Sequence, residues 1–293
     1  MFIDIHVHTR RLPGPPRDES GQTYASPDEL LRRYDEIGVE RAIVLPGVSP
    51  ECCHCPQSNE EVIELAETSG GRLIPFCNVD PRFLTNSADA PLDRLLAHYR
   101  DRGCKGVGEV TANLPLLDPL VQNLLAHAEA MGMPVTFHLA GRIGGTYGLY
   151  DDPGLPQLEQ SLRNFPKLTF LGHSQPFWAE MAALKDPDDR HGYPDYGVGE
   201  EGAVPKLMRQ YPNLRGDLSA NSGHNALARD EDYAVGFLSE FQDRLLFGTD
   251  ICAPDTPTPL VELLLRLRET GRISEVVFNK VARENAVGLL GLE

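Results

Sequence analysis

The sequence predicts a single-domain (β/α)8 TIM barrel, and three observations lead to that fold class. The chain has 293 residues, which matches one barrel of about 250 residues or more. Short runs rich in β-branched residues alternate with segments whose apolar residues recur at helical spacing, as in repeated βα units. No linker interrupts this alternation, so residues 1–293 are expected to form one domain.

The expected elements are bounded by recognisable start and stop signals. Ser26 and Pro27 predict the start of the first helix, because serine is a good N-cap and proline suits the first helical position. Gly103 and Gly132 predict the ends of two later helices. The expected strands cover residues 2–9, 41–48, 73–80, 106–110, 134–140, 168–174, 214–220 and 244–250. The expected helices after the first cover residues 58–69, 92–99, 119–131, 155–165, 203–211, 231–241 and 273–290.

Two histidines lie at the end of the first expected strand. His6 and His8 are one residue apart, so on a strand both side chains point to the same side, roughly 6.5–7 Å apart along the chain. Imidazole is a common ligand for zinc, iron, nickel and copper. The pair therefore predicts half of a divalent-metal site.

Four later strands supply the other candidate ligands. Catalytic groups in this fold lie at the C-terminal ends of the strands, and the apolar runs there end in Glu109, His138, His173 and Asp250. A charge or an imidazole at such an inward position is costly unless it is paired or bound to a metal. The joint occurrence of these residues with His6 and His8 predicts a divalent-metal centre at the barrel mouth.

Charge and hydropathy exclude several classes of partner. The net charge is −16, with 43 acidic against 27 basic residues, which disfavours nucleic acid and other polyanions. No apolar run approaches the roughly 18–20 residues that cross a bilayer, and the N-terminus lacks a signal-peptide pattern. We expect a cytoplasmic protein with a small-molecule substrate and no membrane partner; homo-oligomerisation stays open.

The cysteines are expected to be thiols in a reducing compartment. The cluster Cys52-Cys53-His54-Cys55 resembles part of a zinc knuckle. A structural zinc is disfavoured there because the separated second pair of ligands is missing.

Long loops after the first, fifth and sixth strands are expected to contact the substrate. They carry Arg10, Arg142 and Trp178, and arginine offers a two-pronged fork for carboxylates while an aromatic ring offers a flat apolar wall. Arg142 is the first choice for a substrate carboxylate, because it follows His138 closely in a glycine-rich loop. His191 and His224 fall in loops expected at the same mouth.

With these motifs in place, the chain resembles the amidohydrolase superfamily, in its amidohydrolase-related subgroup. Members carry His-x-His on the first strand, histidines on the fifth and sixth strands and an aspartate on the eighth; the matching residues are His6, His8, His138, His173 and Asp250. The segment 281–292 also resembles the C-terminal helix of that subgroup. The subgroup includes a pyrone dicarboxylate lactonase, non-oxidative decarboxylases and a hydratase, so the resemblance implies a metal-dependent enzyme without deciding its reaction.

Glu109 departs from the pattern of the one-metal decarboxylases. It resembles the bridging acid of TatD-like deoxyribonucleases, or occupies the place of the carboxylated lysine of two-metal amidohydrolases. Either one ion or two ions, the second between Glu109, His138 and His173, is compatible with the sequence, and we favour one. A deoxyribonuclease is disfavoured because the charge balance predicts no basic mouth.

The ligand set predicts a metal-dependent hydrolase of a small anionic ester, lactone or amide, with zinc expected and manganese as the alternative. A divalent ion makes hydroxide available near neutral pH and polarises a carbonyl group. Asp250 is expected to take the proton of the attacking water, and His173 to orient that water or stabilise the oxyanion. The alternative is a decarboxylase or other lyase acting on a small aromatic or unsaturated acid. A barrel without catalytic activity is disfavoured because every expected ligand type is present.

Overall fold

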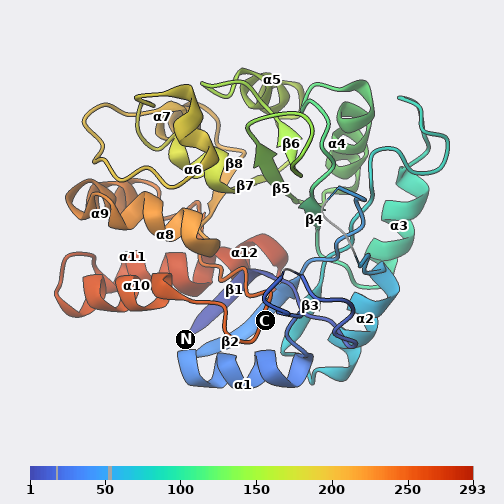
Figure 1. The fold of residues 1–293 in the computed structure, drawn as a ribbon, viewed down its shortest axis with the longest axis horizontal. Coiled ribbons are helices and arrows are strands. Elements are labelled where there is room, and N and C mark those ends of the chain that lie inside the picture. The colour runs from blue at the N-terminus through green and yellow to red at the C-terminus, as the bar shows by residue number, and fades with distance from the viewer. Residues whose placement is uncertain (18, 52–54, 293) are drawn as a thin grey trace.

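The computed structural model describes residues 1–17, 19–51 and 55–292. Its strands gather at the centre and its helices lie around them (Figure 1). The strands are β1 (Phe2–Val7), β2 (Val39–Val44), β3 (Leu73–Pro75), β4 (Val107–Val110), β5 (Val135–Ala140), β6 (Leu149–Tyr150), β7 (Phe170–His173), β8 (Leu214–Asp217) and β9 (Leu245–Leu246).

Eight of these strands form a ring. Parallel pairing runs in the orders β1-β2-β3 and β4-β5-β7-β8-β9. A bridge between Cys77 and Val107 joins β3 to β4, and a bridge between Val7 and Ile251 joins β1 to the segment after β9. The predicted (β/α)8 fold is therefore confirmed. The short strand β6 pairs with β5 outside this order.

Helices follow the strands as the sequence predicts. In α1 the Ser26 hydroxyl accepts from the Glu29 amide and the Glu29 side chain accepts from the Ser26 amide, which is a complete capping box. The helices are α1 (Pro27–Ile37), α2 (Asn59–Thr68), α3 (Asp93–Asp101), α4 (Pro119–Met131), α5 (Pro156–Asn164), α6 (Gln175–Ala179), η1 (Pro187–His191), α7 (Ala203–Gln210), α8 (Ala220–Ala228), α9 (Glu231–Glu240), α10 (Pro259–Glu269), α11 (Glu275–Asn279), η2 (Lys280–Glu284) and α12 (Asn285–Leu290).

The structure adds elements that the sequence analysis did not predict and shortens several that it did. Helices α6, α8 and α10 and the 3-10 helix η1 lie in segments for which the sequence analysis predicts no helix, and His224, expected in a loop, lies on α8. Most strands end earlier than expected, and the last covers two residues instead of 244–250. Beyond Leu246 the chain still forms backbone hydrogen bonds to β1, for example from Asp250 N to His6 O at 2.8 Å. These bonds are isolated and do not form a continuous strand ladder.

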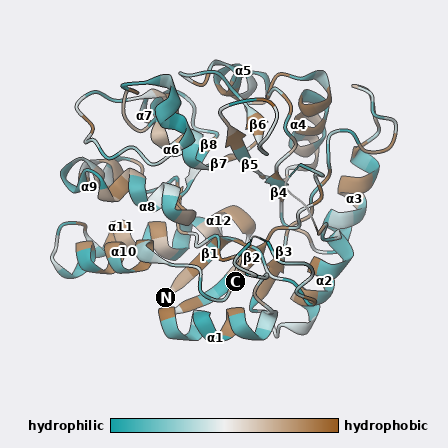
Figure 2. Ribbon diagram, viewed as in Figure 1, coloured by the Kyte–Doolittle hydropathy of each residue, from teal (hydrophilic) through white to brown (hydrophobic). Residues whose placement is uncertain are grey.

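The interior of the ring is filled by aliphatic and aromatic side chains. Ile3, Ile5, Ile43 and Phe76 belong to this cluster, which Leu290 of α12 joins. Because α12 contacts β1 and β9, it helps to cover the end of the ring that is remote from the polar strand ends. Figure 2 shows the hydrophobic strands at the centre and helices whose outward faces are largely hydrophilic. None of the described helices combines the length and the apolar character needed to span a membrane.

A buried carboxylate ties the first strand to the last. Asp4 is fully buried and accepts hydrogen bonds from the Tyr34 hydroxyl at 2.6 Å and from the Thr249 amide at 2.9 Å. The Thr249 hydroxyl and the His6 amide also donate to it, at 2.5 and 3.0 Å. Burial raises the pKa of Asp4 to about 6, although these four donors oppose the shift. This network holds β1, α1 and the chain after β9 together.

Candidate metal centre

His6 on β1 and His8, just beyond the end of β1, turn their imidazoles toward each other. The pairing of β1 with β2 is irregular between Asp4 and Val7, and a bulge of this kind interrupts the alternation of side chains. Ile5 still packs in the interior cluster, and His6 also reaches the interior. The Nε2 atoms of His6 and His8 lie 3.2 Å apart. The expectation that these imidazoles converge is confirmed.

Each histidine is oriented by a partner at its other nitrogen. His6 Nδ1 lies 2.7 Å from Asp217 Oδ2, and His8 Nδ1 donates to the Leu45 carbonyl at 2.9 Å. His173 Nδ1 lies 2.9 Å from the Ser219 hydroxyl. A hydrogen bond at one ring nitrogen fixes the direction of the other. All three Nε2 atoms are thereby aimed at one region.

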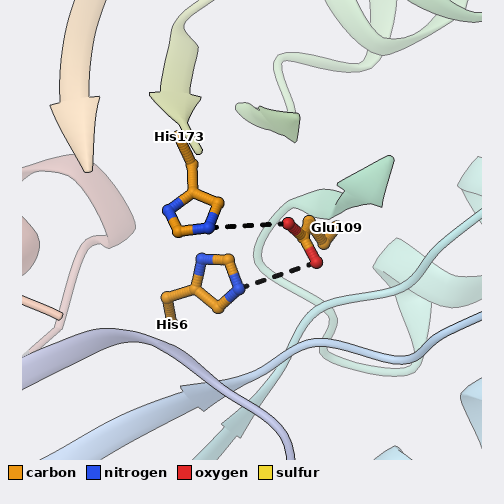
Figure 3. A group of neighbouring side chains, drawn as sticks. All are labelled: His6, Glu109 and His173. Carbon is orange, nitrogen blue, oxygen red and sulfur yellow. Dashed lines mark ion pairs between the residues drawn. The ribbon is translucent and has the colours of Figure 1, made fainter. Parts of the chain in front are cut away.

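Glu109, on β4, lies beside these imidazoles. Figure 3 shows its carboxylate to one side of His6 and His173 with one oxygen toward each ring, Oε2 at 3.7 Å from His6 Nε2 and Oε1 at 3.8 Å from His173 Nε2. Oε2 also lies 3.5 Å from His8 Nε2, and Oε1 lies 2.8 Å from His138 Nδ1. One oxygen thus faces the β1 histidines, while the other faces the histidines of β5 and β7.

Asp250 completes the group on the side of β9. Its Oδ1 lies 3.6 Å from His6 Nε2 and 3.5 Å from His8 Nε2. The residue has φ 54°, in the left-handed region that aspartate and asparagine tolerate better than most other residues. This backbone conformation sends the carboxylate toward β1.

The donor atoms fit a small divalent ion. Neighbouring ligands around a tetrahedral ion with bonds of roughly 2.1 Å lie about 3.4 Å apart. The separations among His6 Nε2, His8 Nε2 and Asp250 Oδ1 are 3.2, 3.5 and 3.6 Å, and Glu109 Oε2 lies at similar distances from both histidines. In the described chain two overlapping groups bring their donor atoms within 4.8 Å of one another, His6 with His8 and Asp250, and His6 with Glu109 and His173. His138 belongs to neither group, but it contacts Glu109 directly.

The electrostatics of the site favour a positive charge among its carboxylates. Burial opposes a charge on His6, but Asp217, Glu109 and Asp250 raise the pKa of His6 well above its usual value. Burial also opposes the charge on Glu109, yet His6 and His138 hold the pKa of Glu109 well below the ordinary range. Metal ligands must be deprotonated. A divalent ion held by these residues would replace the proton of His6 as the charge that balances the carboxylates.

Asp217 is a functional residue that the sequence analysis missed. It ends β8, is fully buried, and supports His6 at Nδ1. A signal for it exists in the sequence, because the polar ends of four strands share a preceding glycine: Gly108-Glu109, Gly172-His173, Gly216-Asp217 and Gly248-Thr249-Asp250. At Gly172 and Gly216 a Cβ atom would lie 2.4 Å from Phe177 and 2.7 Å from Trp178. The glycines thus make room for aromatic side chains.

A cavity of about 320 Å3 opens beside the metal-site residues. His8, Glu109, His138 and Asp250 line it, as does Arg10. The other lining residues are Arg17, Gln22, Tyr24, Gly47, Gln57, Thr111, Tyr147 and Cys252. Arg10, an expected substrate-binding residue, thus lies on the wall of this cavity.

The structure does not bring Arg142 or Trp178 to this cavity. Arg142 is exposed and donates to the Gly145 carbonyl at 3.3 Å. Trp178 is 1% exposed, and its indole N–H donates to the Asp217 carbonyl at 2.8 Å. Neither residue lines the cavity, and the indole of Trp178 packs against Gly216; a substrate contact of either residue stays a prediction.

The other flagged residues play no part in the described centre. His191 packs against Gly141, and His224 is half-buried on α8. Cys52, Cys53 and His54 lie outside the described residues, and Cys55 is a free thiol.

Comparison with known proteins identifies the family. The sequence model described as "Amidohydrolase" matches residues 3–292. The chain belongs to the amidohydrolase family. This amidohydrolase matches no functionally curated protein sequence.

Solved structures share the fold of this amidohydrolase at low sequence identity. An amidohydrolase from Burkholderia multivorans with bound zinc is 16% identical, with a TM-score of 0.65 and 100% of both chains covered. A putative 2-pyrone-4,6-dicarboxylic acid hydrolase from Pseudomonas putida is also 16% identical, with a TM-score of 0.59 and coverage of 100% and 98%. A 2,6-dihydroxybenzoate decarboxylase from Rhizobium is 15% identical, with a TM-score of 0.57 and coverage of 99% and 98%. A hydrolase and a decarboxylase thus have the same fold.

Proposed function

We propose that this amidohydrolase uses a divalent ion, zinc in the first instance, to hydrolyse a small anionic ester, lactone or amide. The observation that supports this most directly is the meeting of His6, His8 and Asp250 donor atoms, within 4.8 Å of one another, at the edge of the 320 Å3 cavity. Cavities of this size suit small molecules. The zinc bound by the Burkholderia multivorans relative supports the choice of ion.

An ion in this site lowers the pKa of a coordinated water from 15.7 to near 7 and polarises a substrate carbonyl group. His6, His8 and Asp250 would hold the ion, with Glu109 Oε2 beside them. Asp250 lines the cavity, and its second oxygen, Oδ2, lies 3.9 Å from His173 Nε2. We assign to Asp250 the role of receiving the proton of the attacking water and passing it to the leaving group.

His173 is the second proposed catalytic residue. Burial, followed by the nearby charge of His6, lowers the pKa of His173 to about 4. The imidazole is therefore neutral at pH 7 and offers a hydrogen bond or a ligand atom instead of a charge. With Nδ1 at Ser219 and Nε2 toward Glu109 and Asp250, it is positioned to orient the water or stabilise the oxyanion.

We propose one tightly held ion, at His6, His8 and Asp250, because His138 Nδ1 is satisfied by Glu109 Oε1 at 2.8 Å. Glu109→Gln keeps the shape of the side chain and removes its charge, so the variant is expected to retain one metal equivalent per chain. Elemental analysis of wild type and variant measures this. Two equivalents in the wild type and one in the variant would show instead that Glu109 bridges two ions.

A triple Cys52/Cys53/Cys55→Ser variant is the control for the metal count. It is expected to keep all of its metal, since the cysteine cluster lacks a second pair of ligands. Loss of one equivalent in this variant would place a structural zinc at the cluster.

A substrate screen separates hydrolysis from the lyase alternative. Zinc-loaded protein is incubated with lactones, esters, amides and aromatic carboxylic acids, and released acid and released carbon dioxide are measured separately. Acid release from a lactone, ester or amide without carbon dioxide is the expected result. Carbon dioxide released from an aromatic or unsaturated acid would favour a decarboxylase, the reaction named for the Rhizobium relative.

A further inference from the structure

Two arginines lie on the wall of the cavity that contains the metal-site residues. Arg10 and Arg17 come from the segment between β1 and α1 and line the cavity together with His8 and Asp250. Among the described residues that line this cavity they are the only arginines, and no lysine accompanies them. The proposed metal site and these two guanidinium groups therefore face the same space.

Arg10 is buried without a full set of acceptors. It is 4% exposed, and its Nε atom has no hydrogen-bond partner in the described part of the chain. Its Cζ atom lies 4.3 Å from the centre of the Tyr24 ring, so the ring supports one face of the guanidinium group but accepts no strong hydrogen bond. A buried N–H without an acceptor is costly. A ligand with acceptor oxygens would remove that cost.

Arg17 shares the same aromatic support. Its Cζ atom lies 4.8 Å from the centre of the Tyr24 ring, and its amide donates to the Gln22 carbonyl at 2.7 Å, which holds the loop closed on itself. Arg17 lines the cavity together with Asp250 and Cys252, and a second cavity, of about 210 Å3, has the same three residues in its wall. Arg17 therefore lies on the Asp250 side of the cavity.

With a divalent ion bound, the net charge of the site would be positive and could be balanced by one anion. A divalent ion and the two arginines together outweigh the carboxylates of Glu109, Asp250 and Asp217. Against a protein of net charge −16, this local excess of positive charge provides the field that an anionic substrate needs. One carboxylate on the substrate would neutralise it.

We infer that Arg10 and Arg17, supported by Tyr24, form a carboxylate-binding subsite that selects substrates with a free carboxylate beside the group that reacts at the metal. The planar guanidinium fork matches the two oxygens of a carboxylate, and an aromatic ring under it fixes its orientation. That this carboxylate neighbours an ester, lactone or amide bond rests on the proposed function. The subsite itself rests on the cavity and on the two arginines.

Equilibrium binding tests the subsite without turnover. The probes are the straight-chain dicarboxylates from malonate to adipate and their monomethyl esters, titrated into zinc-loaded protein by calorimetry. The variants are Arg10→Gln, Arg17→Gln and the charge-conserving Arg10→Lys and Arg17→Lys. Arg142→Gln is the matched control, because it removes the same charge from an exposed position outside the cavity. Metal content and thermal unfolding are measured for every variant.

At least one dicarboxylate is expected to bind the wild type roughly tenfold or more tightly than its monoester, in line with a charge-assisted hydrogen-bonded pair. Arg10→Gln and Arg17→Gln should each reduce this preference by about tenfold, and the lysine variants should restore only part of it. Arg142→Gln should leave it unchanged. If substitution of the buried Arg10 prevents folding, the variants of the half-buried Arg17 test the subsite on their own.

The inference is overturned if no dicarboxylate binds more tightly than its monoester, or if the Arg17 variants keep the full preference at normal metal content. Failure of the proposed hydrolase activity is a separate outcome. A protein that prefers dicarboxylates through Arg10 and Arg17 but releases carbon dioxide from an acid would retain the subsite and change the reaction. A protein that hydrolyses neutral esters with no role for either arginine would retain the reaction and lose the subsite.

Discussion

A variant carrying His8→Ala and Asp250→Asn will lose its bound metal ion and its activity. The two residues supply donor atoms 3.5 Å apart, and neither is fully buried, with side-chain exposures of 15% and 24%. Without them His6 is the only remaining member of the ligand group proposed to hold the ion. The second group, His6 with Glu109 and His173, stays intact in this variant, so metal retained in full would show that the second group holds the ion. Because water without a metal keeps its pKa of 15.7, hydrolysis should fall by more than about a thousandfold. Elemental analysis and the substrate assay measure the two losses.

His8 is substituted instead of His6 so that loss of metal is not confused with loss of folding. His6 is fully buried against Asp217, and removing it would leave a buried carboxylate without its partner at a cost of roughly 3–5 kcal/mol. Asparagine at position 250 suits the φ of 54°, whereas alanine would add backbone strain. His127→Ala on α4 is the control for loss of an imidazole. Full metal occupancy in the double variant would refute the proposed ligand set.

Asp217→Asn is expected to weaken metal binding by about 10–100-fold, the usual effect of removing a carboxylate that supports a ligating histidine. Asp217 Oδ2 lies 2.7 Å from His6 Nδ1 and Oδ1 accepts from the Ser219 amide at 3.0 Å. Asparagine preserves the shape but removes the charge that makes His6 a strong ligand. Competition with a chelator of known affinity measures the dissociation constant.

Asp118→Asn is the matched control for Asp217→Asn. Asp118 caps α4 through Leu120 N, a role that asparagine fills equally well. Its metal affinity should equal that of the wild type. An Asp217→Asn protein whose metal affinity stays within twofold of the wild type would show that Asp217 stabilises the fold without tuning the metal.

The sequence predicted the ring of strands because periodicity and strand ends are local features. Helix α10 was nevertheless overlooked, although Pro259 at its start and Leu260, Leu263, Leu264 and Leu267 at helical spacing mark it. Helix α8 is harder to recognise, because its sequence contains Gly223 and two asparagines, which are weak helix formers. Its helical state comes from packing against α6 and α10.

The candidate-site residues that could be predicted are those that end an apolar run in the sequence. His6, His8, Glu109 and Asp250 do so, and the structure brings their donor atoms together. Asp217 did not, because Arg215 interrupts the apolar pattern of its strand. Loop residues were the least predictable: the sequence favours Arg142 over Arg10, but in the structure Arg10 lines the cavity and stacks on Tyr24, whereas Arg142 does not line it.

The junction between β1 and the chain after β9 has a consequence for biosynthesis. Asp4 and Thr249 bond across it, and the proposed metal ligands on either side are His6 and Asp250. During translation the first of these leaves the ribosome long before the last. A nascent chain therefore cannot assemble the proposed ligand group until the segment that carries Asp250 has been made. An ion that binds only the folded protein shifts the folding equilibrium toward the folded state. Metal binding would therefore stabilise chains that contain both His6 and Asp250, and chains truncated before Asp250 would lack this stabilisation.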